Sequence, residues 1–154
     1  MSQIVILRAD ERHDEALAAL RWVWRVEEAG EDGGSRETFV STFRIWLHDH
    51  RESHHGCLAL YEEQPVGIAW PAITDRIPDP RRVERRSGHV QSVFVRESHR
   101  NRSIGSVMLR ELIVDARAME LDYLVLHPTI NSVPLYRRHG FAVSDGLMEL
   151  RLDR

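Results

Sequence analysis

The feature that most constrains the fold is a change of hydrophobic period within residues 93–116. Val93 and Val95 alternate with other residues, which is the two-residue period of a strand. From Val107 onward the apolar positions recur every three or four residues, which is the period of a helix. The intervening residues, 99–105, are therefore expected to form a turn that leads a strand into the N-terminus of a helix.

This turn has the properties of an anion-binding site. The first-turn amides of a helix lack intrahelical acceptors and carry about half a positive charge from the macrodipole. Arg100 and Arg102 add full charges beside those amides. Ser103 and Ser106 can donate hydroxyl hydrogen bonds, and Gly105 leaves room for a ligand. Because a solvated helix cap has a similar composition, the turn needs a second signal before it indicates a function.

Composition limits the classes of protein that are possible. A chain of 154 residues, 42% hydrophobic and 29% charged, suits a single domain over 1–154. A net charge of -3 gives no overall attraction to nucleic acid or to an anionic membrane. Cys57 is the one cysteine, which excludes an intramolecular disulfide. The sequence shows no signal peptide and no apolar run near the roughly 18 residues of a membrane span, so we expect a cytoplasmic protein.

Periodicity and turn residues predict the remaining elements. They are a strand at 4–7, helices at 14–28 and 35–50, a hairpin of strands 57–61 and 66–70, an exposed connection at 71–88, a strand at 89–95, a helix at 104–120, a strand at 121–127, a short helix at 132–139 and one or two strands within 141–152. This order predicts a mixed α/β (α+β) fold with one central sheet flanked by helices. Strands 89–95 and 121–127 are expected to be parallel because a crossover helix joins them.

The second signal lies downstream of the turn. Residues 100–105 read Arg-Asn-Arg-Ser-Ile-Gly, and residues 129–141 read Thr-Ile-Asn-Ser-Val-Pro-Leu-Tyr-Arg-Arg-His-Gly-Phe. Together they resemble the two motifs of the GNAT superfamily of acetyl-coenzyme A dependent N-acetyltransferases, of the bacterial type. The first family motif is Arg or Gln followed by x-x-Gly-x-Gly or Ala, and Ser103 here replaces its first glycine. Glu97 likewise occupies a position where the family has proline.

The second family motif is Asn-x-x-Ala-x-x-Leu-Tyr-x-x-x-Gly-Phe. Its Leu-Tyr pair is similar to Leu135 and Tyr136, and its Gly-Phe pair ends the 129–141 segment. Thr129 replaces the Asn, and Ser132 replaces the Ala. The resemblance covers essentially the whole chain and is strongest between residues 89 and 141.

The resemblance implies a GNAT fold and transfer of an acetyl group from acetyl-CoA, as cosubstrate, to a primary amine by direct attack. The acceptor would be a small molecule or a peptide, and the protein would be a transferase that can form a homodimer. Tyr136 would be the general acid that protonates the leaving thiolate. The residues implied to bind coenzyme A are Val93, Phe94, Val95, Arg100, Asn101, Arg102, Ser103, Ile104, Gly105, Ser106, Thr129 and Asn131.

The acceptor amine must lose a proton before or during attack. The strand residues nearest the acetyl group, Gln91 to Val93, include no base. By alternation, His89 is expected to share a face with Gln91 and Val93, and an unperturbed pKa of about 6.5 suits proton uptake. Glu28, at the end of the first helix, can also accept the proton through water. Both residues therefore stay open as a water-relayed base.

Several alternatives also stay open. The departures at Glu97 and Ser103 are compatible with a GNAT-fold sensor or interaction module that binds an acyl-CoA without efficient catalysis. Tryptophans and acids at the end of the first helix favour a cationic acceptor, although acids at such an end are also typical of solvated surface. These residues are Trp22, Trp24, Glu27, Glu28, Glu31 and Asp32. The histidines at 48, 50, 54 and 55 lack cysteine or carboxylate partners, so we expect no metal site.

Overall fold

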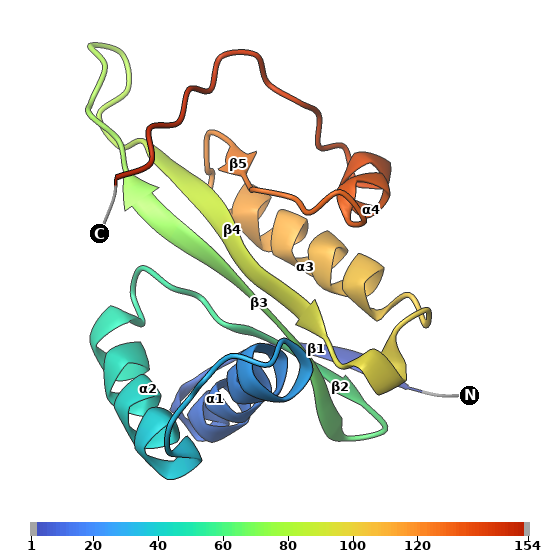
Figure 1. Cartoon of the computed structure of the whole chain (residues 1–154). Coiled ribbons are helices and arrows are strands. Elements are labelled where there is room, and N and C mark those ends of the chain that lie inside the picture. Colours follow the sequence, from blue (N-terminus) through green and yellow to red (C-terminus); the bar gives the residue numbers. More distant parts are fainter. Residues whose placement is uncertain (1–2, 153–154) are drawn as a thin grey trace.

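The computed structural model describes residues 3–152 and contains a five-stranded sheet in the order β1-β2-β3-β4-β5 (Figure 1). The strands are β1 (Ile4–Arg8), β2 (Cys57–Tyr61), β3 (Gln64–Asp75), β4 (Arg86–Val95) and β5 (Leu124–Val125), and the helices are α1 (Asp14–Trp22), α2 (Arg36–His50), α3 (Ile104–Ala118) and α4 (Val133–Arg138). Neighbouring strands are antiparallel from β1 to β4, whereas β4 and β5 are parallel. The predicted mixed α/β class and the predicted parallel pair are confirmed.

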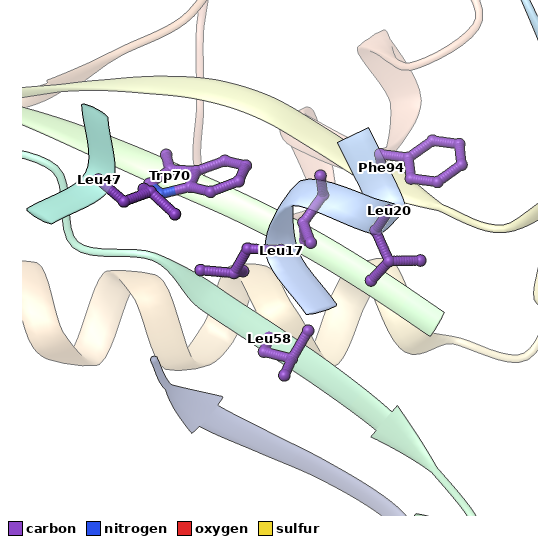
Figure 2. Close-up of a cluster of buried hydrophobic side chains, with 7 residues drawn as sticks. Leu17, Leu20, Leu47, Leu58, Trp70 and Phe94 are labelled. Atoms are coloured by element: carbon purple, nitrogen blue, oxygen red, sulfur yellow. The ribbon is translucent and has the colours of Figure 1, made fainter. Parts of the chain in front are cut away.

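Helices α1 and α2 cover one face of the sheet, and α3 covers the other (Figure 1). Successive residues of β3 serve both faces, because Ile68 and Trp70 face α1 and α2 while Ala69 faces α3. Figure 2 shows the cluster between the sheet and α1 and α2. Its buried members are Leu17, Leu20, Leu47, Leu58, Ile68, Trp70 and Phe94. The α3-side cluster consists of Ala59, Val66, Ala69, Val90, Ile104, Met108 and Leu112.

A β-bulge interrupts the alternation of side chains in β4. Ile68 of β3 pairs with Phe94, but Trp70, only two residues on, pairs with Gln91. One more residue therefore lies on β4 than on β3 across this interval. Ser92 within the bulge has a φ of 59°, which is the left-handed region. A bulge of this kind re-aims the side chains that follow it.

The bulge corrects the face that was predicted for His89. Val90 and Val93 both pack into the α3-side cluster, although simple alternation would place them on opposite faces. Phe94 then points toward α1. Since His89 precedes Val90, it lies on the α1 and α2 face and not with Val93. The prediction that His89 and Val93 share a face is wrong, because the extra residue between them reverses the parity.

Most element boundaries follow the sequence pattern, with two differences in the first two-thirds of the chain. The helix predicted at 14–28 ends its α-helical part at Trp22 and continues as a π-helical segment, Val23–Glu28. The exposed connection predicted at 71–88 is wrong at both ends, where residues 71–75 and 86–88 are strand, whereas residues 76–85 do connect the two strands. β3 runs to Asp75 and β4 begins at Arg86, because Pro71 and Ala72 are buried and pair with the next strand. The proline and arginine content of this segment predicts a loop, but its ends are strands because they pair within the sheet and are partly buried there.

The C-terminal third differs more. The strand predicted at 121–127 is reduced to Leu124–Val125, and within the described residues 141–152 contain no strand. The apolar side chains of this segment are exposed, with Met148 at 93% and Leu150 at 84%. A strand needs a buried face, and no element of the described chain provides one for this segment. None of the helices in the described part is both long enough and apolar enough to cross a membrane.

Candidate active site

The parallel strands β4 and β5 separate toward their carboxyl ends. Within residues 3–152, their register contains only the pairs Gly88 with Leu124 and His89 with Val125. The β5-facing edge of β4 is therefore unpaired from Val90 to Val95, and its main-chain groups can accept an extended ligand. The side chains of Val93 and Val95 pack against the α3-side cluster. The gap that a peptide-like arm requires is present.

The turn after β4 presents main-chain donors next to this gap. Asn101 and Ser103 have φ values of 62° and 61°, and α3 begins directly afterwards at Ile104. In the described chain, the amides of residues 101–106 donate to no protein acceptor, whereas the Val107 amide donates to the Ser103 carbonyl at 3.0 Å. The free amides and the positive end of the α3 dipole together favour an anion.

The two arginines of the turn differ in their surroundings. Nη1 of Arg102 donates to the Tyr61 hydroxyl at 2.7 Å, and its guanidinium lies 5.0 Å from the centroid of the Tyr61 ring. Arg100 instead pairs with Glu28, its Nη2 lying 2.6 Å from Oε1, and donates through Nε to the Val95 carbonyl at 3.0 Å. Arg102 is exposed and belongs to the turn. Arg100, through its pair with Glu28, connects the turn to the end of the first helical segment.

Residues of α3 also connect to α4. The Ser106 hydroxyl and Nε2 of His139 lie 2.6 Å apart. A Cβ added at Gly105 would meet only Leu135, at an ordinary contact distance of 3.6 Å. The protein itself therefore does not require glycine at this position. A ligand that approaches the backbone closely would require it.

Tyr136 lies on α4, with its ring edge-on to Phe141 at 5.8 Å. Burial raises the pKa of its hydroxyl, which keeps the phenol protonated. The ring lines a cavity of about 610 Å³ between β5, α4 and the segment 141–147. Among the described residues, those lining this cavity include none from β4 or from the turn, so the structure does not place Tyr136 and residues 100–106 in one cavity.

Residues 129–132, which begin the second motif, form the loop before α4. Thr129 donates through Oγ1 to the Ser132 hydroxyl at 3.0 Å, and the Ser132 hydroxyl donates to the Thr129 carbonyl at 2.9 Å. These two bonds hold the loop that leads into the helix. Asn131 is exposed.

His89 belongs to a polar chain that the sequence did not reveal. Its Nε2 lies 3.2 Å from Nδ1 of His127, and Nε2 of His127 lies 3.5 Å from Oε2 of Glu149. Burial, followed by the charge of a protonated His127, lowers the pKa of His89. His127 is the last residue of the predicted strand 121–127, at the end of the strand where ligands bind in open α/β sheets, and this signal was available. Glu149 has no comparable signal.

Arg21 of α1 is a second residue that sequence reasoning missed. Its Nη1 donates to the Ser92 hydroxyl at 2.8 Å, so it contacts the bulge itself. Its guanidinium lies 5.1 Å from the Trp24 ring, which stacks on Phe94 at 5.3 Å. In the described residues, no group of three or more His, Cys, Asp and Glu side chains is arranged to hold a metal ion.

A mixed sheet whose parallel pair opens at its carboxyl ends, beside a helix that begins with free amides, defines the architecture of GNAT acetyltransferases. The family model described as Acetyltransferase (GNAT) family matches residues 15–141, and the chain belongs to this family. No curated protein matches the sequence.

Solved structures show the same fold over nearly the whole chain. One from Clostridium acetobutylicum, described as a predicted acetyltransferase with acetyl-CoA, is 20% identical, covers 97% of this chain and 96% of its own, and has a TM-score of 0.74. A GCN5-related N-acetyltransferase from Ralstonia eutropha is 22% identical, with 98% and 99% covered and a TM-score of 0.70. The glucosamine-6-phosphate N-acetyltransferase from Arabidopsis thaliana is 14% identical, with 98% and 99% covered and a TM-score of 0.73.

Proposed function

We propose that the protein is an N-acetyltransferase, acting as a single domain, that moves the acetyl group of acetyl-CoA to a primary amine. The observation that carries the proposal is the open β4 edge, Val90–Val95, lying next to the free amides of residues 101–106. The pantetheine arm adds to this edge through main-chain hydrogen bonds. The pyrophosphate binds the turn, where charge-assisted hydrogen bonds from amides and from Arg102 are strong.

The amine nitrogen attacks the thioester carbonyl directly and forms the new C–N bond. The C–S bond then breaks, so the acetyl group is transferred to the nitrogen and the coenzyme A thiolate leaves. His89 takes the ammonium proton through water, supported by His127 and Glu149, which lie behind it. Glu28 has less capacity for this role because its carboxylate is already paired with Arg100. The base is therefore assigned to His89, on the face that α1 and α2 cover.

Tyr136 supplies a proton to the departing thiolate. Its raised pKa keeps the hydroxyl protonated across the physiological range. The Ser106 to His139 hydrogen bond fixes α4, which carries Tyr136, to the helix that begins at the phosphate turn. Proton delivery in the transition state is typically worth about 10²–10⁴ in rate.

The proposal is tested by titrating acetyl-CoA into the protein in a calorimeter and then following thiol release with a panel of amines. Binding together with amine-dependent thiol release is expected. Binding without release by any amine would favour an acyl-CoA sensor. Absence of binding would remove coenzyme A from the function of this chain.

A further inference from the structure

The charge distribution beside the β4 bulge indicates what the acceptor carries besides its amine. Arg21 is partly buried and reaches the bulge through its hydrogen bond to the Ser92 hydroxyl. Within residues 3–152 it forms no ion pair with a carboxylate, unlike Arg25 and Arg100. Burial and the neighbouring charge of Arg25 lower the pKa of the Arg21 guanidinium. Its surroundings in the protein therefore disfavour the charged form.

The acids that would neutralise Arg21 are engaged elsewhere. Glu28 pairs with Arg100, and Glu31 pairs with Arg25. Two of the acids that favoured a cationic acceptor are thus already paired. A partly desolvated guanidinium has five donors in a planar fork, and only one contact to a neutral hydroxyl is made here. Carboxylate and phosphate groups match that fork in two places at once.

The position of Arg21 relates it to the acceptor and not to coenzyme A. Ser92 follows Gln91 and His89, which lie on the face that α1 and α2 cover. The β5-facing edge, where coenzyme A is proposed to lie, is the main-chain edge of the same strand and is unpaired beyond His89 in the described part of the chain. Arg21 therefore reaches the bulge from the face on which His89, the proposed base, also lies.

We propose that Arg21 binds an anionic group, a carboxylate or a phosphate, on the acceptor, so that the substrate class is an amine that also carries a negative charge. This inference rests on the proposed function and names the acceptor class of the same site. Because Arg21 touches the bulge, the anion would also orient the amine relative to the acetyl carbonyl. Proximity and orientation of this kind contribute to the rate as well as to binding.

The test compares matched acceptors. Amino acids are paired with their amides, and aminoalkyl phosphates with the corresponding amino alcohols, and kcat/KM is measured by thiol release. The wild-type protein is expected to prefer the anionic member of at least one pair by about tenfold or more. Which pair shows the preference distinguishes carboxylate from phosphate. Arg21→Ala should reduce the ratio to about one, while the rate with the neutral member and the affinity for acetyl-CoA stay close to wild type.

Two further variants keep the result interpretable. Arg21→Lys should retain part of the preference, because the charge remains but the fork is lost. Arg12→Ala, which removes an exposed arginine paired with Asp10 before α1, should retain all of it. An equal rate with both members of every pair, or a preference that survives Arg21→Ala, would overturn the inference.

The anion subsite and the acetyltransferase activity can fail separately. If acetyl-CoA binds and no amine is acetylated, the proposed function fails. The subsite is then measured by titrating the same amine pairs into the protein loaded with acetyl-CoA. Tighter binding of the anionic members, lost in Arg21→Ala, would support the subsite, and equal binding would refute it.

Discussion

The Glu28 carboxylate holds the Arg100 guanidinium at 2.6 Å, and its other oxygen accepts the Glu97 amide at 3.2 Å. Glu28 lies 69 positions before Glu97 and 72 positions before Arg100 in the chain. These two contacts join the end of the first helical segment to the turn that precedes α3. The Glu28 side chain is only 19% exposed, which strengthens the pair relative to a surface one. The contact makes Glu28 a positioning residue of the turn.

Glu28→Gln is therefore expected to lower the affinity for acetyl-CoA and the free energy of unfolding, the latter by about 1 kcal/mol, since a charge-assisted hydrogen bond is replaced by a neutral one. The acidic limb of the pH profile should remain. Calorimetry, urea unfolding and a pH-rate profile measure the three quantities. Loss of the acidic limb with affinity intact would instead make Glu28 the base.

Arg102→Ala should weaken acetyl-CoA binding by about tenfold and reduce its dependence on salt, because one guanidinium contact to phosphate is removed. Tyr61→Phe serves as the control. It keeps the aromatic ring under Arg102 but removes the hydroxyl that the guanidinium contacts at 2.7 Å, so a much smaller effect is expected. Unchanged affinity in both Arg100→Ala and Arg102→Ala would place the phosphate site outside this turn.

Ser103→Gly should stabilise the fold by about 0.5–1 kcal/mol. The left-handed conformation at a φ of 61° costs a non-glycine residue about 1–2 kcal/mol, and glycine loses about 0.5–1 kcal/mol more through its backbone entropy. Ser106→Gly is the matched control and should destabilise, because Ser106 is helical and its hydroxyl contacts His139. Chemical denaturation measures both. A lower stability in Ser103→Gly would show that the serine side chain offsets its strain.

The pH dependence of the rate should report His89. Because burial and His127 lower its pKa, His89 stays neutral below its ordinary value of about 6.5, and the acidic limb should lie below that pH. His127→Asn should move the limb upward, and His89→Gln should abolish it. The unfolded chain binds this proton more readily, so the free energy of unfolding should fall as pH drops from about 6.5 toward the lowered pKa. A limb unchanged in both variants would place the base elsewhere.

Tyr136→Phe should lower the maximal rate by about 10²-fold or more at all pH values, while affinity for acetyl-CoA stays nearly intact. The phenyl ring preserves the edge-on contact with Phe141, so the fold should be retained. Thermal unfolding checks this retention. Full turnover by Tyr136→Phe would exclude the tyrosine as the acid.

The sequence by itself determined the elements whose evidence is local. The change of period between Val95 and Val107 predicted β4, the turn and α3, and the crossover rule predicted that β5 is parallel to β4. Short-range apolar spacing reports which side of an element is buried, and α3 is buried on the side that its spacing indicates. The motif residues at 100–105 and 129–141 also indicated the family that the comparison shows.

Only the tertiary structure decided which side chains meet at the site. The bulge at Ser92 adds one residue to β4 and so reverses the faces of His89 and Val93, which no period in the sequence records. The contact between Arg21 and Ser92 likewise joins residues 71 positions apart. Such contacts depend on strand register and helix placement, which are set by packing across the whole sheet and not by the residues' own neighbours in the chain.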